Sequence, residues 1–242
     1  MRVRRNPASP VSGLFVTGTD TGVGKTVVAC TIAATLAARG RRVSVFKPVV
    51  TGLAETEHGP PDHERLRASA RSSQSAADVS PYLFDPPVSP HLAAEWAGQA
   101  VEPHVLRAAA HSALVSGDVL VAEGVGGLMV PLAPGYLVRD LAADLALPLV
   151  IAARPGLGTI SHTLMTLECA RAAGLDVRAV VLTPWPARPS QMQCSNRDTI
   201  ARLGEVEVMT LGELDLRRTA LDLRPQLPVE RWIAAAPVRA AA

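Results

Sequence analysis

The chain has 242 residues, of which 48% are hydrophobic and only 3% aromatic. This length fits one large α/β domain or two small ones, and the composition predicts a core of Ala, Val and Leu. A formal net charge of +2, with basic residues scattered along the chain, argues against partners such as nucleic acid or an acidic membrane surface. The three cysteines, an odd and widely spaced set, are typical of reduced thiols in a cytoplasmic protein.

Both ends of the chain are predicted to be tails. Residues 1–10 carry the charge of a signal peptide's first region, but a Gly-rich loop soon interrupts the apolar stretch that follows, so no signal peptide is expected. No apolar run approaches the ~20 residues that a membrane-spanning helix needs. We therefore predict a tail over residues 1–12, a single domain over 13–233 and a second tail over 234–242.

The first predicted elements are a strand, a Gly-rich loop and a helix. Leu14–Val16 is apolar enough for a buried strand, and Val27–Ala37 has the pattern of a helix that Gly40 ends. Between them stands Gly18-Thr-Asp-Thr-Gly-Val-Gly-Lys-Thr26. A glycine-rich turn between a strand and a helix is the context of a phosphate-binding loop.

The residues of this loop fit a nucleotide. Three glycines let the backbone N–H groups curl around a phosphate, and the N-terminus of the helix adds its dipole. Lys25 is placed to reach the outer phosphates, and the Thr26 hydroxyl to ligate Mg²⁺. Five residues separate Gly18 from Gly24, one more than in the common form of this loop.

Short apolar runs then alternate with helical patterns. The predicted strands are Val43–Phe46, Val119–Ala122, Leu149–Ala152, Ala179–Thr183 and Val206–Thr210. The predicted helices are Val105–Val115, Leu137–Leu145, Thr159–Ala173 and Gln191–Leu203. Continuous apolarity in the strands predicts an α/β fold, with a mostly parallel sheet between helices on both faces. The least regular region, Leu53–Ser80, is expected to be a surface excursion with a short helix from Asp62.

Ligands of such folds bind at the carboxyl ends of the strands, where the chemistry-bearing residues collect. Lys47 and Thr51 follow one predicted strand, and Glu123 with a Gly-rich stretch follows another. Lys25 and Lys47 are the only lysines, and all other basic residues are arginine. Because an ammonium is a compact point charge and a guanidinium is flat, two retained lysines mark two sites where Arg would not serve. Glu123 is the expected second anchor for Mg²⁺.

These motifs resemble the dethiobiotin synthetase family of the biotin pathway, in order and spacing from about residue 13 to 210. The segments that carry the resemblance are Gly18–Thr26, Lys47–Gly52, Ser80-Pro-Tyr with Pro90-His91, Glu123–Gly127 and Gly158–Leu164. The long spacing from Gly18 to Gly24 is this family's own form of the loop. The resemblance implies a single-domain P-loop fold.

It also implies an ATP-dependent carboxylation and ring closure. CO₂ or bicarbonate would carboxylate an amine of 7,8-diaminononanoate, ATP would phosphorylate the carbamate, and the neighbouring amine would displace phosphate to form dethiobiotin. A homodimer with shared active sites is implied too.

The same resemblance assigns roles to residues. Lys25 and Lys47 would be catalytic. Mg²⁺ would be held by three residues: Thr26, Asp62 and Glu123. The nucleotide phosphates would meet Asp20, Thr21, Gly22, Val23, Gly24, Lys25, Thr26, Glu123 and Gly126. The substrate would meet Thr21, Lys47, Thr51 and Gly126, and its carboxylate would meet Gly158, Thr159, Ile160 and Ser161 of the neighbouring subunit. A helix cap is the alternative role for Asp62.

Two positions depart from the family pattern. Gly22 stands where members often carry an acidic residue, so one contact near the phosphates is either missing or supplied by solvent. Thr183 stands where some members use an Asn to read adenine, so Thr183, Pro184 and Trp185 are the predicted base contacts, and ATP or another NTP could serve.

Two other functions share this chemistry. A nucleotide-switched partition or septum-positioning ATPase has the same fold, but typically carries another lysine near the start of the loop, where this chain has Thr19-Asp-Thr21. An enzyme that amidates a corrinoid or another carboxylate would need a glutaminase domain, for which the chain has no room.

Overall fold

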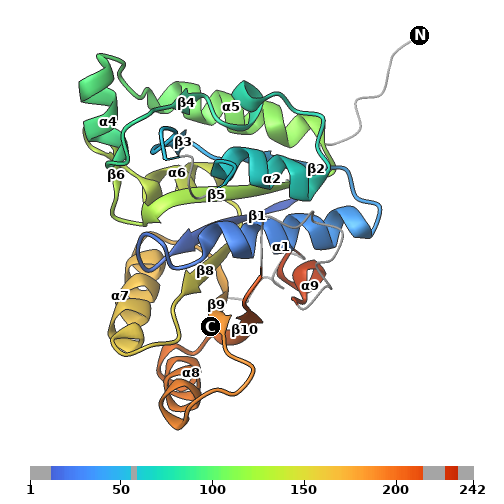
Figure 1. Cartoon of the computed structure of the whole chain (residues 1–242), viewed down its shortest axis with the longest axis vertical. Coiled ribbons are helices and arrows are strands. Elements are labelled where there is room, and N and C mark those ends of the chain that lie inside the picture. Colours follow the sequence, from blue (N-terminus) through green and yellow to red (C-terminus); the bar gives the residue numbers. More distant parts are fainter. Residues whose placement is uncertain (1–11, 56–58, 215–226, 234–242) are drawn as a thin grey trace, which may run out of the picture.

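A computed structural model of the chain describes residues 12–55, 59–214 and 227–233. The main strands are β1 (Gly13–Gly18), β2 (Val43–Phe46), β5 (Val119–Gly127), β8 (Leu149–Ala153), β9 (Val177–Trp185) and β10 (Glu207–Gly212). They form one six-stranded sheet in the order β10-β9-β8-β1-β5-β2, and every pairing in it is parallel (Figure 1). The predicted α/β class is confirmed.

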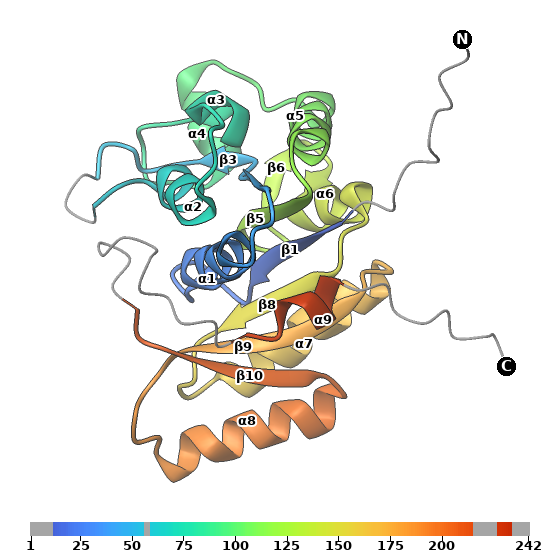
Figure 2. The same cartoon turned by 90° about the vertical axis from the view of Figure 1, so that its right-hand side faces the viewer.

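Helices cover both faces of this sheet (Figure 2). One face packs against α1 (Lys25–Ala38), α2 (Asp62–Ala70) and α9 (Val229–Ile233). The other packs against α5 (Pro103–Ser116), α6 (Val138–Leu145), α7 (Thr159–Ala172) and α8 (Gln191–Gly204). Leu14 and Val16 enter the first core, whereas Phe15 between them enters the second. Because successive side chains of a strand point to opposite faces, burial on both faces explains the continuous apolar runs.

Strand β5 is longer than its apolar run predicts. We expected it to end at Ala122, with Glu123 and the glycines in a following loop, but β5 continues to Gly127. Val16 of β1 is in register with Glu123, and Gly18 with Gly127. The ladder to β1 thus holds Glu123 and Gly127 despite their low strand propensity, and its register shifts between them, where Gly124 and Gly126 lie.

The outer side of the edge strand β2 is paired by a side chain. The amide of Gln74 donates to the carbonyl of Val45 at 3.0 Å and accepts from its N–H at 2.8 Å, so it imitates a neighbouring strand along β2. Ser72 holds the same amide oxygen at 2.9 Å. The described part of the region Leu53–Ser80 is therefore more ordered than predicted: besides the expected helix from Asp62, it forms α3 (Ala76–Val79), and Gln74 covers an edge that would otherwise invite pairing.

Several short elements were not predicted. These are β3 (Val49–Val50), β4 (Tyr82–Leu83), α4 (Pro90–Ala97), β6 (Pro131–Ala133), β7 (Tyr136–Leu137) and α9. Within the described ranges, no helix is long and apolar enough to cross a membrane. The predicted tails fall outside the described residues, apart from position 12.

Candidate functional site

The phosphate loop joins β1 to α1 at the carboxyl edge of the sheet. Gly22 and Gly24 have φ angles of 69° and 96°, a region that favours glycine. A Cβ on Gly24 would also lie 2.5 Å from Cγ2 of Thr183, so the neighbouring strand β9 leaves no space for a side chain. Backbone conformation and close packing both require glycine at position 24.

Lys25 is enclosed by its own loop. Its Nζ donates to the carbonyl of Asp20 at 2.7 Å, and the residue is only 7% exposed. Burial lowers the pKa of the Lys25 ammonium to about 8. A buried ammonium whose hydrogen-bonded partner is a neutral carbonyl is well suited to meet phosphate oxygens.

Lys47 joins two carboxylates that come from different parts of the chain. Its Nζ lies 2.7 Å from Oδ2 of Asp62, at the start of α2, and 2.7 Å from Oε1 of Glu123, on β5. The hydroxyl of Thr26 donates to the same Glu123 oxygen at 2.8 Å. The cap of α2 is Pro61, so Asp62 does not cap this helix and its carboxylate faces the site.

The charges of this cluster are strongly coupled. Burial alone would lower the pKa of Lys47, but the two carboxylates outweigh it and raise that pKa, which favours the charged form of Lys47. Burial would raise the pKa of Asp62, but the charge of Lys47 outweighs it and the pKa falls. Burial dominates at Glu123 and raises its pKa. Glu123, with 0% exposure, is the member whose charge is least compensated by its neighbours.

The same cluster fits Mg²⁺. Oε2 of Glu123 is buried and has no hydrogen-bond partner among the described residues. Asp62 and the Thr26 hydroxyl supply further oxygen ligands nearby. Mg²⁺ prefers hard oxygen ligands and usually takes only one or two carboxylates, so the donor set matches the ion.

These residues line one cavity of about 690 Å³. Of the predicted residues, it contains Thr21, Gly22, Gly24, Lys25, Thr26, Lys47, Thr51, Asp62, Glu123 and Gly126. Sequence reasoning missed the rest of the wall: Val27, Val49, Glu55, Arg65, Pro87, Val88, Ser89, Pro90, Val125 and Val130. Val49, Pro90 and Val125 lie in the segments that carry the family resemblance, but none of them was predicted as a site residue. The valines carry no chemical signal in the sequence, because only the fold shows that they face a cavity.

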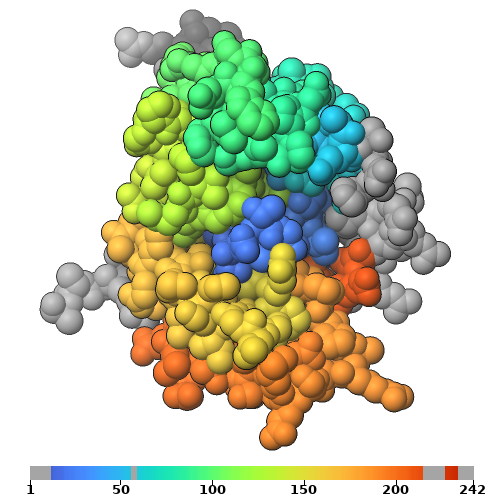
Figure 3. Space-filling view, turned by 60° about the vertical axis from the view of Figure 1, so that its left-hand side comes forward, coloured from blue at the N-terminus to red at the C-terminus, as the bar shows by residue number. Residues whose placement is uncertain are grey.

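The other predicted residues lie outside this cavity. Val23 packs into the core, and Asp20 accepts the N–H of Thr21 at 2.7 Å. Thr183 is buried against the loop at Gly24, and the guanidinium of Arg197 stands 5.9 Å above the ring of Trp185. Residues 158–161 begin α7 on the same edge of the sheet, and Figure 3 shows the segment around 150–160 (yellow) beside the phosphate loop (blue). They do not join Lys47 within one chain.

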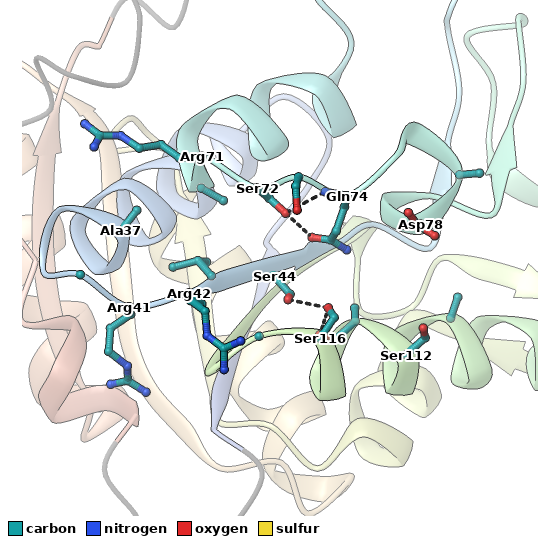
Figure 4. Close-up of a pocket in the computed structure, with 18 residues that line it drawn as sticks. Ala37, Arg41, Arg42, Ser44, Arg71, Ser72, Gln74, Asp78, Ser112 and Ser116 are labelled. Atoms are coloured by element: carbon teal, nitrogen blue, oxygen red, sulfur yellow. Dashed lines mark hydrogen bonds between the residues drawn. The ribbon is translucent and has the colours of Figure 1, made fainter.

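A second hollow of about 790 Å³ lies at the other end of the strands, around the start of β2 and the ends of α1, α2 and α5 (Figure 4). Two of its arginines already pair with carboxylates, Arg42 with Asp118 at 2.7 Å and Arg41 with Glu230 at 3.5 Å. It holds no phosphate loop, so its size alone does not mark it as the site.

A phosphate loop at the carboxyl edge of a parallel sheet, with a lysine and an acidic residue facing it, defines a P-loop ATPase. In agreement, a family model described as an AAA domain matches residues 12–219. The chain is 36% identical to the ATP-dependent dethiobiotin synthetase of Bacillus velezensis, over 81% of this chain and 83% of that protein. It is 39% identical to the enzyme of that name from Anaeromyxobacter dehalogenans, over 87% and 95%. The chain belongs to the dethiobiotin synthetase family.

Solved structures agree on the fold alone. A ParA family ATPase from Chlorobium tepidum matches with a TM-score of 0.52 at 16% identity, over 92% of this chain and 95% of that one. At this identity the match says nothing about which reaction or switch the chain performs.

Proposed function

We propose that the chain is an ATP-dependent dethiobiotin synthetase that carboxylates 7,8-diaminononanoate and closes its ureido ring. One observation carries the proposal: a buried lysine is held between two carboxylates directly opposite a phosphate loop, in a cavity that also has an apolar wall. The identity of the substrate is inferred from the family, and the cavity has the chemical features that this substrate needs.

The polar half of the cavity suits two anions. A carbamate and a triphosphate repel each other, by about 4 kcal/mol for two unit charges 4 Å apart at an effective dielectric of ~20. Lys25 and Lys47 would supply the cations between them. One carbamate oxygen would attack the γ-phosphorus with release of ADP. The second amine would then attack the carbamoyl carbon, and phosphate would leave with that oxygen, closing the ring.

Thr26, Asp62 and Glu123 would hold Mg²⁺, which when bound neutralises phosphate charge. Lys47 would turn one of its hydrogen bonds from a carboxylate to the carbamate. No general base is assigned among the described residues that line the cavity, because positioning with charge neutralisation is enough for this class of chemistry.

The apolar half of the cavity suits the substrate's carbon chain. Val49, Val88, Val125 and Val130 line it beside Lys47 and Thr51. The diamine end would meet Thr21, Lys47, Thr51 and the backbone of Gly126, while the methylene chain would pass along the valines. An anionic group would be disfavoured on such a wall, so the distal carboxylate must be received elsewhere.

The carboxylate would be received by residues 158–161 of a second copy of the chain. Gly158 caps α7, whose N-terminus favours an anion. Leu157 is 92% exposed, and Met129 and Met165 are 57% and 59% exposed. An apolar surface around α7 supports a homodimer with shared sites.

We place this small-molecule enzyme in the cytoplasm.

The nucleotide base would lie beside Thr183, Pro184 and Trp185. Thr183 offers one hydroxyl and Pro184 no N–H, so the triphosphate would be held firmly and the base loosely. ATP is the co-substrate that the family uses, and other nucleoside triphosphates are expected to serve.

A product assay tests the proposal. Purified protein is incubated with 7,8-diaminononanoate, bicarbonate, Mg²⁺ and ATP, and the products are analysed by mass spectrometry. We expect one dethiobiotin and one ADP per turnover, and no product when the diamine is omitted. ATP hydrolysis that does not depend on the diamine, without dethiobiotin, would reject the proposal.

A further inference from the structure

The loop of residues 154–158 joins β8 to α7 and is tied to the phosphate loop at its first residue. Nη2 of Arg154 donates to the carbonyl of Thr21 at 3.1 Å. Next to it, the N–H of Thr19 donates to the carbonyl of Ala152 at 3.0 Å. These bonds fix one end of the loop, and its other end is the N-terminus of α7.

A side chain from a distant helix fixes the middle of this loop. Asn196 of α8 is only 6% exposed, and its Nδ2 donates to the carbonyls of Pro155 and of Gly156, each at 3.1 Å. Both amide hydrogens are thus spent on consecutive carbonyls of one turn. A buried amide with this geometry fixes the orientation of two peptide units.

The turn fixed by Asn196 leads directly into the first turn of α7. The carbonyl of Gly156 also accepts the N–H of Thr159 at 3.3 Å, and Gly158 follows with a φ of 87°. The N–H groups of Ile160 and Ser161 donate to no acceptor among the described residues. The carbonyls of the turn are therefore occupied, while N–H groups of the helix remain available.

We infer that Asn196 is a positioning residue for the substrate's carboxylate. By holding the carbonyls of Pro155 and Gly156, it keeps their partial negative charge from turning toward the anion and keeps the N–H groups of Ile160 and Ser161 in a binding arrangement. This inference rests on the proposed function, in which those N–H groups receive the carboxylate. Preorganised donors bind an anion more tightly than donors that must first be ordered.

Asn196 has no role in the chemical step. Its proposed role differs from that of a residue that only stabilises α8 in which kinetic constants a substitution would change. Substitution of a purely structural residue would change the KM values of both substrates, or only the free energy of unfolding. A positioning residue for the carboxylate changes only the binding of molecules that carry one.

The experiment compares two diamines in steady-state kinetics. One is 7,8-diaminononanoate, and the other is 2,3-diaminononane, which has a methyl group in place of the carboxylate. For Asn196→Ala we expect the KM of the carboxylate-bearing diamine to rise about tenfold, while its kcat and the KM of ATP stay within about twofold. The KM of the diamine without a carboxylate should be unchanged within about twofold.

Two further variants keep the test decisive if Asn196→Ala folds poorly. Asn196→Asp has the same shape but no amide donors and should raise the KM more than Ala, whereas Asn196→Ser retains one donor and should fall between wild type and Ala. Ser195→Ala, an exposed neighbour on the same helix, is the matched control and should behave as wild type.

The two proposals fail in different ways. If wild-type protein processes both diamines with equal KM, the carboxylate site itself is wrong. If wild type prefers the carboxylate-bearing diamine and the Asn196 variants keep that preference in full, only the role of Asn196 is overturned. Equal KM increases for both diamines in the variants would likewise reduce Asn196 to a structural residue.

Discussion

Two hollows of similar volume lie at opposite ends of the strands of the sheet, about 690 Å³ at the phosphate loop and about 790 Å³ around the start of β2. Their charged side chains differ in how far they are exposed to solvent. At the phosphate loop, the Lys47 side chain is 5% exposed and its partner Glu123 is fully buried. At the other hollow, the Arg42 side chain is 75% exposed beside Asp118. Buried, coupled charges distinguish a site better than volume does, because a protein keeps charge out of water only where other interactions compensate.

The largest expected effect comes from removing the buried cation. Lys47→Ala should lower kcat/KM by about 10²–10³-fold, the usual range for losing one donor to transition-state charge. Arg42→Ala, in the other hollow, should leave kcat/KM within about twofold. Thermal unfolding of both variants checks the fold, and Lys47→Ala should regain some stability in Mg²⁺, because Glu123 loses its cationic partner. Equal kinetic effects of the two substitutions would erase the distinction between the hollows.

A second effect concerns the metal. Glu123→Gln keeps the shape of the side chain but removes its charge, so the Mg²⁺ concentration for half-maximal rate should rise about tenfold or more. Binding of the diamine, measured by calorimetry without nucleotide, should change little. An unchanged Mg²⁺ titration would remove Glu123 from the metal site.

The carboxylate end of the cavity should respond to charge without affecting the nucleotide. Thr159→Glu places an anion at the N-terminus of α7 and should raise the KM of the diamine substrate about tenfold, with nucleotide affinity retained. Thr159→Gln is the control for size. A fully active monomer in sedimentation at assay concentrations would contradict the shared site.

At the opposite edge, substitutions should affect stability alone. Gln74→Ala removes two hydrogen bonds to β2 and one from Ser72, and it leaves the Val45 backbone groups unpaired, so the free energy of unfolding should fall by about 1–3 kcal/mol. The kinetic constants should stay at wild-type values. A large loss of activity in folded Gln74→Ala protein would give that edge a functional role.

The smallest effect is expected at the base. CTP, GTP and UTP should support the reaction within about tenfold of the kcat/KM of ATP, a difference of about 1.4 kcal/mol. Kinetics of the four nucleotides at equal Mg²⁺ measure this. A thousandfold preference for ATP would mean that buried groups read adenine and that the predicted base contacts are misplaced.

The sequence predicted the sheet and much of the cavity, because strand ends in a parallel sheet meet at one edge. Lys47 and Glu123 are 76 residues apart, yet Nζ of Lys47 lies 2.7 Å from Oε1 of Glu123, because each directly follows the parallel register pair of Phe46 with Ala122. The true end of β5 was not predictable from propensity, since pairing with β1 decides it. The roles of Gln74 and Asn196 were not predictable either, because an amide's partners depend on segments that only the fold brings together.

The most direct test of the central claim follows one oxygen atom. In the proposed reaction, a carbamate oxygen derived from CO₂ attacks the γ-phosphorus and leaves with phosphate when the ring closes. Wild-type protein supplied with ¹⁸O-labelled CO₂, and sampled before the label exchanges with water, should release phosphate with one ¹⁸O atom. Phosphate without label, formed together with dethiobiotin from a CO₂ pool that is still labelled, would contradict a phosphorylated carbamate and the chemistry assigned to this site.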